Sequence, residues 1–133
     1  MKPLLKKDIG SLGEKLAAKH LRRQRCKILA RNCQCGKNEL DLVVKDGDYI
    51  AFVEVKTLTF EHAKENTDRR PSMAIDIGKR RRTAEAMRHY LREHPTKLLP
   101  RLDAVEVYLD RETLKPFKIH HIPDAFGTDG SIH

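Results

Sequence analysis

Two acidic residues inside apolar segments are the feature of this sequence that points to chemistry. Residues 40–44 and 49–55 are rich in Leu, Val, Ile and aromatic side chains, yet they contain Asp41 and Glu54, and Lys56 follows the second run. Strand propensity and burial favour apolar or β-branched residues at such positions. A buried charge needs a partner or a function, because burying it alone is unfavourable. These three side chains are therefore candidates for a catalytic or metal-binding site.

The segment between the two runs predicts that they form a β-hairpin. The Asp46-Gly47 dipeptide is typical of a tight two-residue turn, which would pair Lys45 with Asp48. Side chains alternate faces along a strand, so this register places Asp41 diagonal to Glu54 on one face. A shift of two residues would set them directly opposite, and only a one-residue slip or a bulge would separate them.

Two neighbouring carboxylates repel each other, which raises a pKa or requires a cation between them. Mg²⁺ prefers oxygen ligands and is typically held by one or two carboxylates together with water and substrate phosphate. We therefore predict a Mg²⁺ or Mn²⁺ ion held by Asp41 and Glu54. Lys56 would orient an attacking water or stabilise charge that develops on a phosphate. The alternative is a hairpin with a solvated acidic face and an edge lysine.

Composition limits the class of protein. A chain of 133 residues is long enough for one domain, residues 1–133, with residues 127–133 expected to be a loose tail. The 27 Lys and Arg residues against 19 Asp and Glu residues give a net charge of +8, which favours a nucleic acid partner but also serves solubility. The sequence contains no apolar run of about 18 residues, so no membrane span is predicted, and the beginning of the chain lacks an apolar signal core. We expect a cytoplasmic protein.

The three cysteines suit reduced thiols, because their number is odd. Cys33 and Cys35 form only a C-x-C, which lacks the second ligand pair of a zinc site. They are interpreted as loop residues.

The predicted elements are a helix, three strands, a second helix and two further strands. The first helix, residues 8–24, carries Glu14 at the edge of its apolar stripe, and no cation lies three or four residues away. Glu14 is either a boundary residue or a third metal-site carboxylate. Asp103 is expected to pair with Arg101 or with the second helix. The other expected segments are strands at 27–31, 102–109 and 116–122, polar loops at 32–38 and 57–73, and a helix at 75–94 stopped by Pro95.

The second helix carries the basic run Lys79, Arg80, Arg81 and Arg82 in its first half, and Ile77 is expected to face inward. Cations near the start of a helix gain nothing from its macrodipole. The run is therefore either a solvated basic face or a patch that contacts nucleic-acid phosphates.

An Asp, a spacer of twelve residues and then Glu-x-Lys resembles the core of the PD-(D/E)xK nuclease superfamily. Successive blocks of residues 10–126 resemble the YraN-like family: GSLGEKLAAKHL, ARN, ELDLVVKDGDYIAFVEVKT, AIDIGKRRR, RLDAVEVY and HHIPDAF. That family is similar to archaeal Holliday-junction resolvases and other restriction-endonuclease-like proteins. The resemblance implies an α/β (α+β) fold, a mixed β-sheet flanked by helices.

The resemblance also implies roles for the site residues. By position, Asp41 would be the central metal ligand, Glu54 the second ligand, Lys56 the catalytic lysine and Glu14 the first-helix carboxylate near the metal. Glu39 matches the glutamate that precedes the aspartate in this family. Two positions depart from the family pattern: relatives usually have Gly where Asn38 stands and a basic residue where Leu58 stands.

Together these features predict a metal-dependent endonuclease that hydrolyses DNA phosphodiester bonds, including those of branched or structured DNA. The alternative is a nucleic-acid-binding protein that keeps the nuclease fold without turnover and acts in a repair or recombination complex. A single site cuts both strands of a duplex or junction most simply as a homodimer, which is a further hypothesis.

Overall fold

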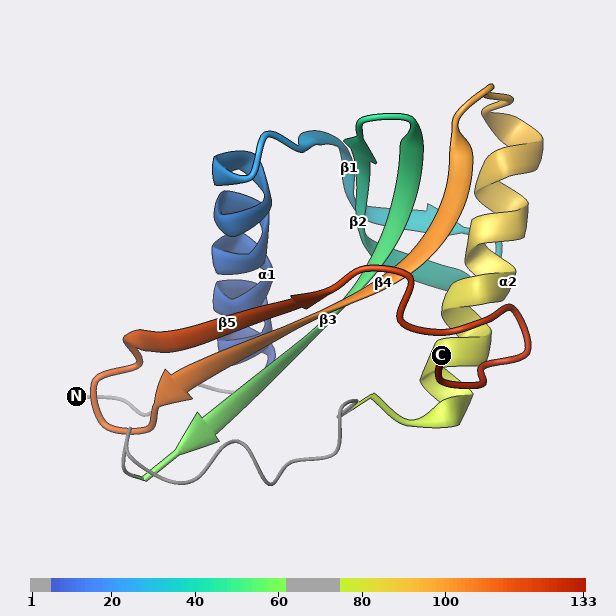
Figure 1. The fold of residues 1–133 in the computed structure, drawn as a ribbon. Coiled ribbons are helices and arrows are strands. Elements are labelled where there is room, and N and C mark those ends of the chain that lie inside the picture. The colour runs from blue at the N-terminus through green and yellow to red at the C-terminus, as the bar shows by residue number, and fades with distance from the viewer. Residues whose placement is uncertain (1–5, 62–74) are drawn as a thin grey trace.

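The computed structural model describes residues 6–61 and 75–133, which form a five-stranded sheet with a helix on each side (Figure 1). The strands lie in chain order; β3 and β4 are parallel, and every other neighbouring pair is antiparallel. The predicted fold class, a mixed sheet flanked by helices, is confirmed. The elements are α1 (Lys6–Arg23), β1 (Lys27–Cys35), β2 (Asn38–Asp46), β3 (Tyr49–Phe60), α2 (Ile77–Glu93), β4 (Leu99–Asp110) and β5 (Pro116–Ile122).

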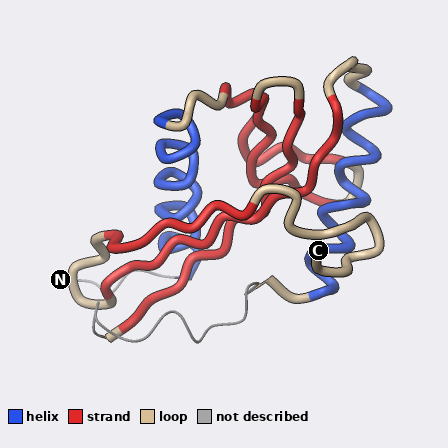
Figure 2. The backbone as a smooth tube through the Cα atoms, in the orientation of Figure 1, coloured by secondary structure: helices blue, strands red, loops and turns tan. Residues whose placement is uncertain are grey.

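The two helices pack on opposite faces of the sheet because strand side chains alternate between those faces. The side chains of Ala17, Ala18 and Leu21 anchor α1 in one core cluster, and Met87 and Tyr90 anchor α2 in the other. Figure 2 shows the strands running between the two helices. No helix in residues 6–61 and 75–133 is both long and apolar enough to cross a membrane.

The polar stretch 32–38 is not the loop that the sequence predicts. It continues β1 to Cys35 and begins β2 at Asn38, so only Gly36 and Lys37 form the turn, with Gly36 at a φ of 62°. Since β1 is an edge strand and mostly half-buried or exposed, polar residues are tolerated in it. Cys33 and Cys35 therefore lie in a strand, and all three cysteines of the chain are free thiols.

The strand register of the β2–β3 hairpin differs by two residues from the expected one, in which Lys45 pairs with Asp48. Asp46 pairs with Tyr49, so the turn is Gly47 and Asp48, and Gly47 adopts a φ of 59°. Lys45 pairs with Ile50 rather than with Asp48. The shift moves the turn without exchanging the two faces, because side chains alternate with a period of two.

The third strand extends into the segment expected to be a loop. β3 pairs with β4 along its whole length, from Tyr49 with Leu99 to Phe60 with Asp110. Residues 57–60 are therefore strand, and residues 62–73 of the expected loop lie outside the described part of the chain. This long β3 strand forms one wall of the cleft described below.

The second helix confirms the predicted segment with two corrections. The Asp76 side chain accepts a hydrogen bond from the Lys79 N–H at 2.9 Å and caps the start of the helix. The helix ends at Glu93, with His94 as its C-cap before Pro95. Ile77 was expected to face inward but is 45% exposed, because the buried side of α2 runs through Arg80, Thr83 and Met87. The second correction concerns Arg80, which was predicted to contact phosphate. Its side chain is buried, whereas a phosphate contact requires an accessible side chain.

The segment 127–133, expected to be loose, is instead hydrogen-bonded to α2 and to itself. The Arg80 Nε–H donates to the Gly130 carbonyl at 2.6 Å, and its guanidinium also donates to the Ile75 carbonyl. Phe126 forms a β-bridge with Ile132. A buried guanidinium must satisfy its donors, and these backbone carbonyls do so.

Asp103 has the structural role that the sequence predicts. It is fully buried and accepts hydrogen bonds from Arg101 at 2.8 Å, from His121 at 2.8 Å and from the Asp124 N–H at 3.0 Å. Burial alone would raise the pKa of Asp103, but the hydrogen bonds from His121 and Arg101 hold it below its ordinary value. This network joins β4, β5 and the segment after β5.

Candidate functional site

The candidate site lies where β2 and β3 separate. Their pairing ends at Leu42 with Val53, after which β3 continues beside β4 while β2 turns away together with β1 (Figure 1). The next residues in line are Asp41 and Glu54, one on each strand. Beyond the last pair, Asp41 Oδ2 accepts the Val55 N–H at 2.9 Å, in place of a backbone carbonyl of β2. Asp41 is therefore fixed at the fork by the backbone of the neighbouring strand.

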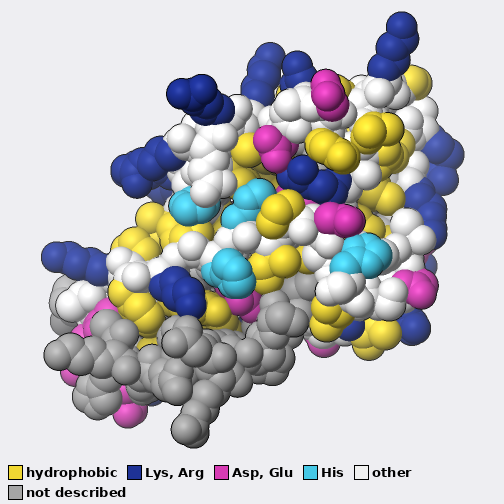
Figure 3. Space-filling model, in the orientation of Figure 1, with side chains coloured by type: hydrophobic (Ala, Val, Ile, Leu, Met, Phe, Trp, Pro, Cys, Tyr) yellow, Lys and Arg dark blue, Asp and Glu magenta, His cyan; other side chains and the backbone are white. Residues whose placement is uncertain are grey.

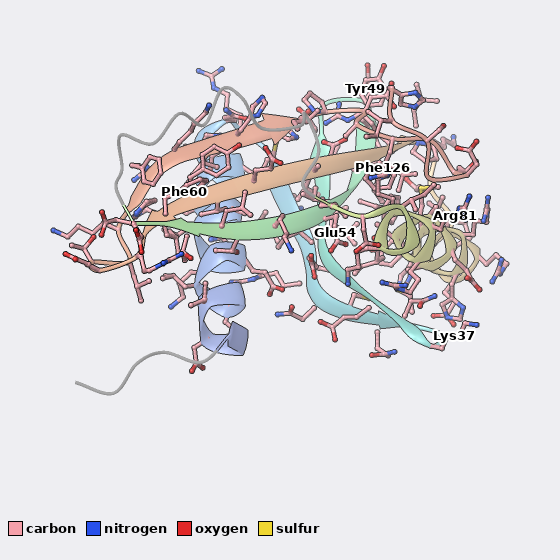
Figure 4. The ribbon with its side chains drawn as sticks, turned by 90° about the horizontal axis from the view of Figure 1, so that it is seen from below. Lys37, Tyr49, Glu54, Phe60, Arg81 and Phe126 are labelled. Atoms are coloured by element: carbon pink, nitrogen blue, oxygen red, sulfur yellow. The ribbon has the colours of Figure 1, made fainter. Side chains whose placement is uncertain are left out.

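Glu54 is held from the side of α2. Its side chain is buried, with the residue only 3% exposed; Oε2 accepts the Thr83 hydroxyl at 2.8 Å, and Oε1 lies 3.6 Å from Lys79 Nζ. Figure 4 shows Glu54 between the two helices, on the side where the β1–β2 hairpin runs toward Lys37. The two α2 residues are one helical turn apart and face the same carboxylate.

Glu14 reaches the same place from α1. This helix approaches β3 closely at Gly13, whose missing side chain leaves room for Thr57. The half-buried Glu14 lies near the side chains of Asp41 and Asn32, and it lines the same cleft as Asp41 and Glu54. Three carboxylates from three different elements therefore meet at the fork.

A cleft of about 510 Å³ opens at this point. Lys56 is exposed and lines it, whereas Glu39 is exposed, does not line it, and acts on Glu14 through its charge. Arg81 and Arg82 are exposed on α2 and also do not line the cleft. The lining residues are Ile9, Gly10, Glu14, Asp41, Glu54, Val55, Lys56, Thr57, Thr59, Ile75, Asp76 and Lys79.

The structure adds residues to the site that the sequence prediction missed. Thr83 orients Glu54, and Asn32 lies near Glu14. Lys79, which the sequence predicts as a phosphate contact, also lies beside Glu54 and lines the cleft. The only sequence signal for Thr83 is a polar residue at an inward position of the second helix. Asn32 gave no signal, because its segment was predicted to be a loop.

Burial and the nearby charge of Asp41 make Glu14 and Glu54 hard to ionise. The pKa of Glu54 is raised to about 8, by burial first and by the charge of Asp41 second, while Lys79 and Thr83 oppose this rise. The pKa of Glu14 is raised to about 7 by burial and by Asp41, with a further contribution from Glu39. A divalent cation would favour the ionised form of both groups.

The donor set fits Mg²⁺ or Mn²⁺. The available ligands are carboxylate oxygens, which hard cations prefer. Within residues 6–61 and 75–133, no three Cys, His, Asp or Glu side chains form a ready-made metal cage. This is compatible with a Mg²⁺-type site, in which protein carboxylates supply only one or two ligands and water or phosphate oxygens supply the others.

The raised pKa values predict how stability depends on pH in metal-free protein. The folded state keeps protons on Glu14 and Glu54 that the unfolded chain releases near its ordinary pKa of 4.5. The contribution of these protons to the free energy of unfolding is therefore present below pH 4.5 and is lost as the pH rises to about 8. Urea unfolding in EDTA should show a decrease of more than about 1 kcal/mol from pH 5 to pH 8.

Two further arms test this assignment. Glu54→Gln should reduce the decrease, and saturating Mn²⁺ should oppose it at pH 8, because a bound cation stabilises only the folded state. An equal pH dependence in wild type and Glu54→Gln would show that other groups cause it.

Comparison with known proteins places the chain in a family. Residues 13–107 match the uncharacterised protein family UPF0102. A UPF0102 protein of Caldanaerobacter subterraneus subsp. tengcongensis is 39% identical over 127 residues, which cover 95% of this chain and 100% of the relative. Relatives from Geobacter metallireducens (36% identical; 90% of this chain, 93% of the relative) and Porphyromonas gingivalis (38%; 90% and 84%) are also UPF0102 proteins. The chain therefore belongs to UPF0102, the family whose YraN-like sequence blocks the chain carries.

Proposed function

We propose that this protein is a metal-dependent nuclease that hydrolyses phosphodiester bonds in DNA. The observation that carries the proposal is the position of Glu54. It is almost fully buried beside Asp41, and its pKa is raised by that burial and that charge. Two such carboxylates are unfavourable for a purely structural purpose, whereas they suit a site that binds a divalent cation.

Each residue has a role in the proposed reaction. Asp41 and Glu54 hold a Mg²⁺ or Mn²⁺ ion, and Glu14 adds a third carboxylate to the same cleft, close to Asp41. When bound, the ion supplies positive charge for the phosphate and lowers the pKa of a coordinated water. Lys56 lines the cleft two residues beyond Glu54, where its ammonium group orients the attacking water or stabilises charge on the phosphate.

The proposed substrate is DNA, with branched or structured DNA among the candidates. The net charge of +8 favours a polyanion. Lys and Arg side chains are spread over the face seen in Figure 3 rather than gathered in one patch, and Arg81 and Arg82 remain exposed on α2 for phosphate contacts. The predicted homodimer would supply two clefts for paired cuts, and a protein that makes paired cuts while remaining monomeric in light scattering would contradict it.

A cleavage panel tests the proposed activity. Single-stranded, duplex, flapped and four-way-junction DNA are incubated with Mg²⁺ or Mn²⁺ and wild-type protein, with Glu54→Ala in parallel. Glu85→Ala is a matched control, because Glu85 is exposed on the same helix as Thr83 and outside the cleft. We expect cleavage by wild type and Glu85→Ala and its loss in Glu54→Ala.

The rival function is nucleic acid binding without turnover. The exposed arginines of α2 favour it, because their phosphate contacts would not depend on the carboxylates. It predicts binding that weakens steeply with salt and is unchanged by Glu54→Ala. Tight binding of any DNA on the panel without metal-dependent cutting by the wild type would support this function and reject the nuclease.

A further inference from the structure

Lys79 places an ammonium group on the inner carboxylate of the site without a tight hydrogen bond. Its Nζ lies 3.6 Å from Glu54 Oε1, beyond the usual 2.7–3.2 Å range for N–H···O hydrogen bonds. The Lys79 side chain is 39% exposed and that of Glu54 only 4%. The contact is therefore made from the cleft side, and the ammonium group can leave it without unpacking the core.

The base of Lys79 is fixed even though its tip is accessible. Its backbone N–H is bound by the Asp76 side chain at 2.9 Å, and its carbonyl lies 3.0 Å from the Thr83 hydroxyl. The same hydroxyl lies 2.8 Å from Glu54 Oε2. Glu54 Oε2 is thus held by the Thr83 hydroxyl of α2, and Oε1 faces the ammonium group of Lys79. The backbone of Lys79 is fixed on the same helix, while its side chain is free to change conformation.

A divalent cation held by Asp41 and Glu54 would compete with the Lys79 ammonium group for the Glu54 carboxylate. A cation bound by Asp41 and Glu54 brings two positive charges to the place where Lys79 now supplies one, and like charges repel. We propose that Lys79 is a resident counter-ion of the metal-free site, released by metal binding to contact the phosphate of the nucleic acid. This inference rests on the proposed function. It makes Lys79 a second positively charged side chain of the cleft that acts on the phosphate, beside Lys56.

Metal binding tests the first half of the proposal. Mn²⁺ affinity is measured by electron paramagnetic resonance at about pH 9, where Glu54 is ionised because its raised pKa is about 8. The proteins are wild type, Lys79→Met and Lys97→Met, the last being a matched loss of an exposed lysine beyond the other end of α2. Lys79→Met should bind Mn²⁺ about 3- to 10-fold more tightly than wild type, because the competing charge is gone. Lys97→Met should match wild type, and Lys79→Arg should stay near it because the positive charge is kept.

The salt dependence of DNA binding tests the second half. Each phosphate contact adds about one to the slope of log affinity against log salt concentration. With Ca²⁺ present, and with the DNA verified as intact on a gel, Lys79→Met should lose about one unit of slope relative to wild type. In EDTA, where Lys79 stays on Glu54, the two slopes should agree.

The outcomes separate this inference from the proposed function. Unchanged or weaker Mn²⁺ binding by Lys79→Met would overturn the inference and make Lys79 a structural partner of Glu54. Equal slopes in both metal states would overturn the phosphate contact. A wild-type protein that binds no Mn²⁺ at all would overturn the proposed function and this inference with it. If the wild type cleaves DNA with metal but Lys79→Met changes neither the Mn²⁺ affinity nor the salt slope, the inference alone is overturned.

Discussion

Asp41→Asn is expected to abolish metal-dependent cleavage while making the metal-free protein more stable at pH 8. The rate should fall by at least about 10²–10³-fold, because the variant would lose a charged ligand of the proposed metal ion. Stability should rise because the Asp41 charge is one cause of the raised pKa values of both Glu14 and Glu54. Opposite changes in activity and stability are typical of functional sites.

The fold should tolerate this substitution. An Asn carbonyl can still accept the Val55 N–H that Asp41 binds at 2.9 Å. The checks are initial cleavage rates and urea unfolding at pH 8, with DNA affinity measured in EDTA to show that binding remains. Full activity in Asp41→Asn would remove the central residue from the proposed mechanism, and a loss of stability would show that the Asp41 charge supports the fold.

Gly13→Ala is expected to produce the largest loss of stability of any conservative change on α1. A Cβ at position 13 would stand 1.7 Å from Thr57 Oγ1 and within 3.0 Å of the other Thr57 side-chain carbons, so rotating the threonine leaves a clash. The helix must then move away from β3. Overpacking of this kind usually costs about 1–3 kcal/mol, and we expect about 3 kcal/mol or more here. Mn²⁺ binding should weaken too, because Glu14 is the next residue.

Gly10→Ala is the matched control for this prediction. Gly10 lies one turn earlier in α1, and an added Cβ would meet nothing within 4 Å. The control should be neutral or more stable by up to about 1 kcal/mol, because alanine favours helix over glycine. Thr57→Ala should restore part of the stability lost in Gly13→Ala, as measured by a double-mutant cycle in urea. Equal stabilities of Gly10→Ala and Gly13→Ala would contradict the close approach of α1 to β3.

Local pattern was sufficient to predict most elements and to predict that Asp41 and Glu54 lie together. An apolar stripe located the first helix, and Pro95 marked the end of the second. Runs rich in Leu, Val, Ile and aromatic residues located the β2–β3 hairpin, and alternation located β4. The placement of Asp41 and Glu54 on one face did not depend on the turn, since a two-residue shift preserves the faces. The same reasoning assigned Asp103 to a structural pairing with Arg101, which the structure contains.

The features that could not be predicted depend on contacts between distant segments. Arg80 is buried because the carbonyl groups of Ile75 and Gly130 accept its hydrogen bonds. The contact between α2 and the segment 127–133 cannot be predicted from the local sequence pattern. Thr83 and Lys79 join the site because α2 packs against the sheet in a position that brings both residues to Glu54. Strand β1 extends through polar residues because its partner β2 supplies the hydrogen bonds, which outweighs weak local propensity.

The parallel pairing of β3 with β4 has a consequence for the order of folding. The β1–β2–β3 meander pairs segments that are close in sequence, whereas every β3–β4 pair, such as Tyr49 with Leu99, joins residues fifty positions apart. Closing such a loop is slow compared with hairpin formation. Asp41 and Glu54 should therefore meet early, on a hairpin whose amides gain protection first in pulse-labelled hydrogen exchange, and Lys79 and Thr83 should reach them only when β4 docks.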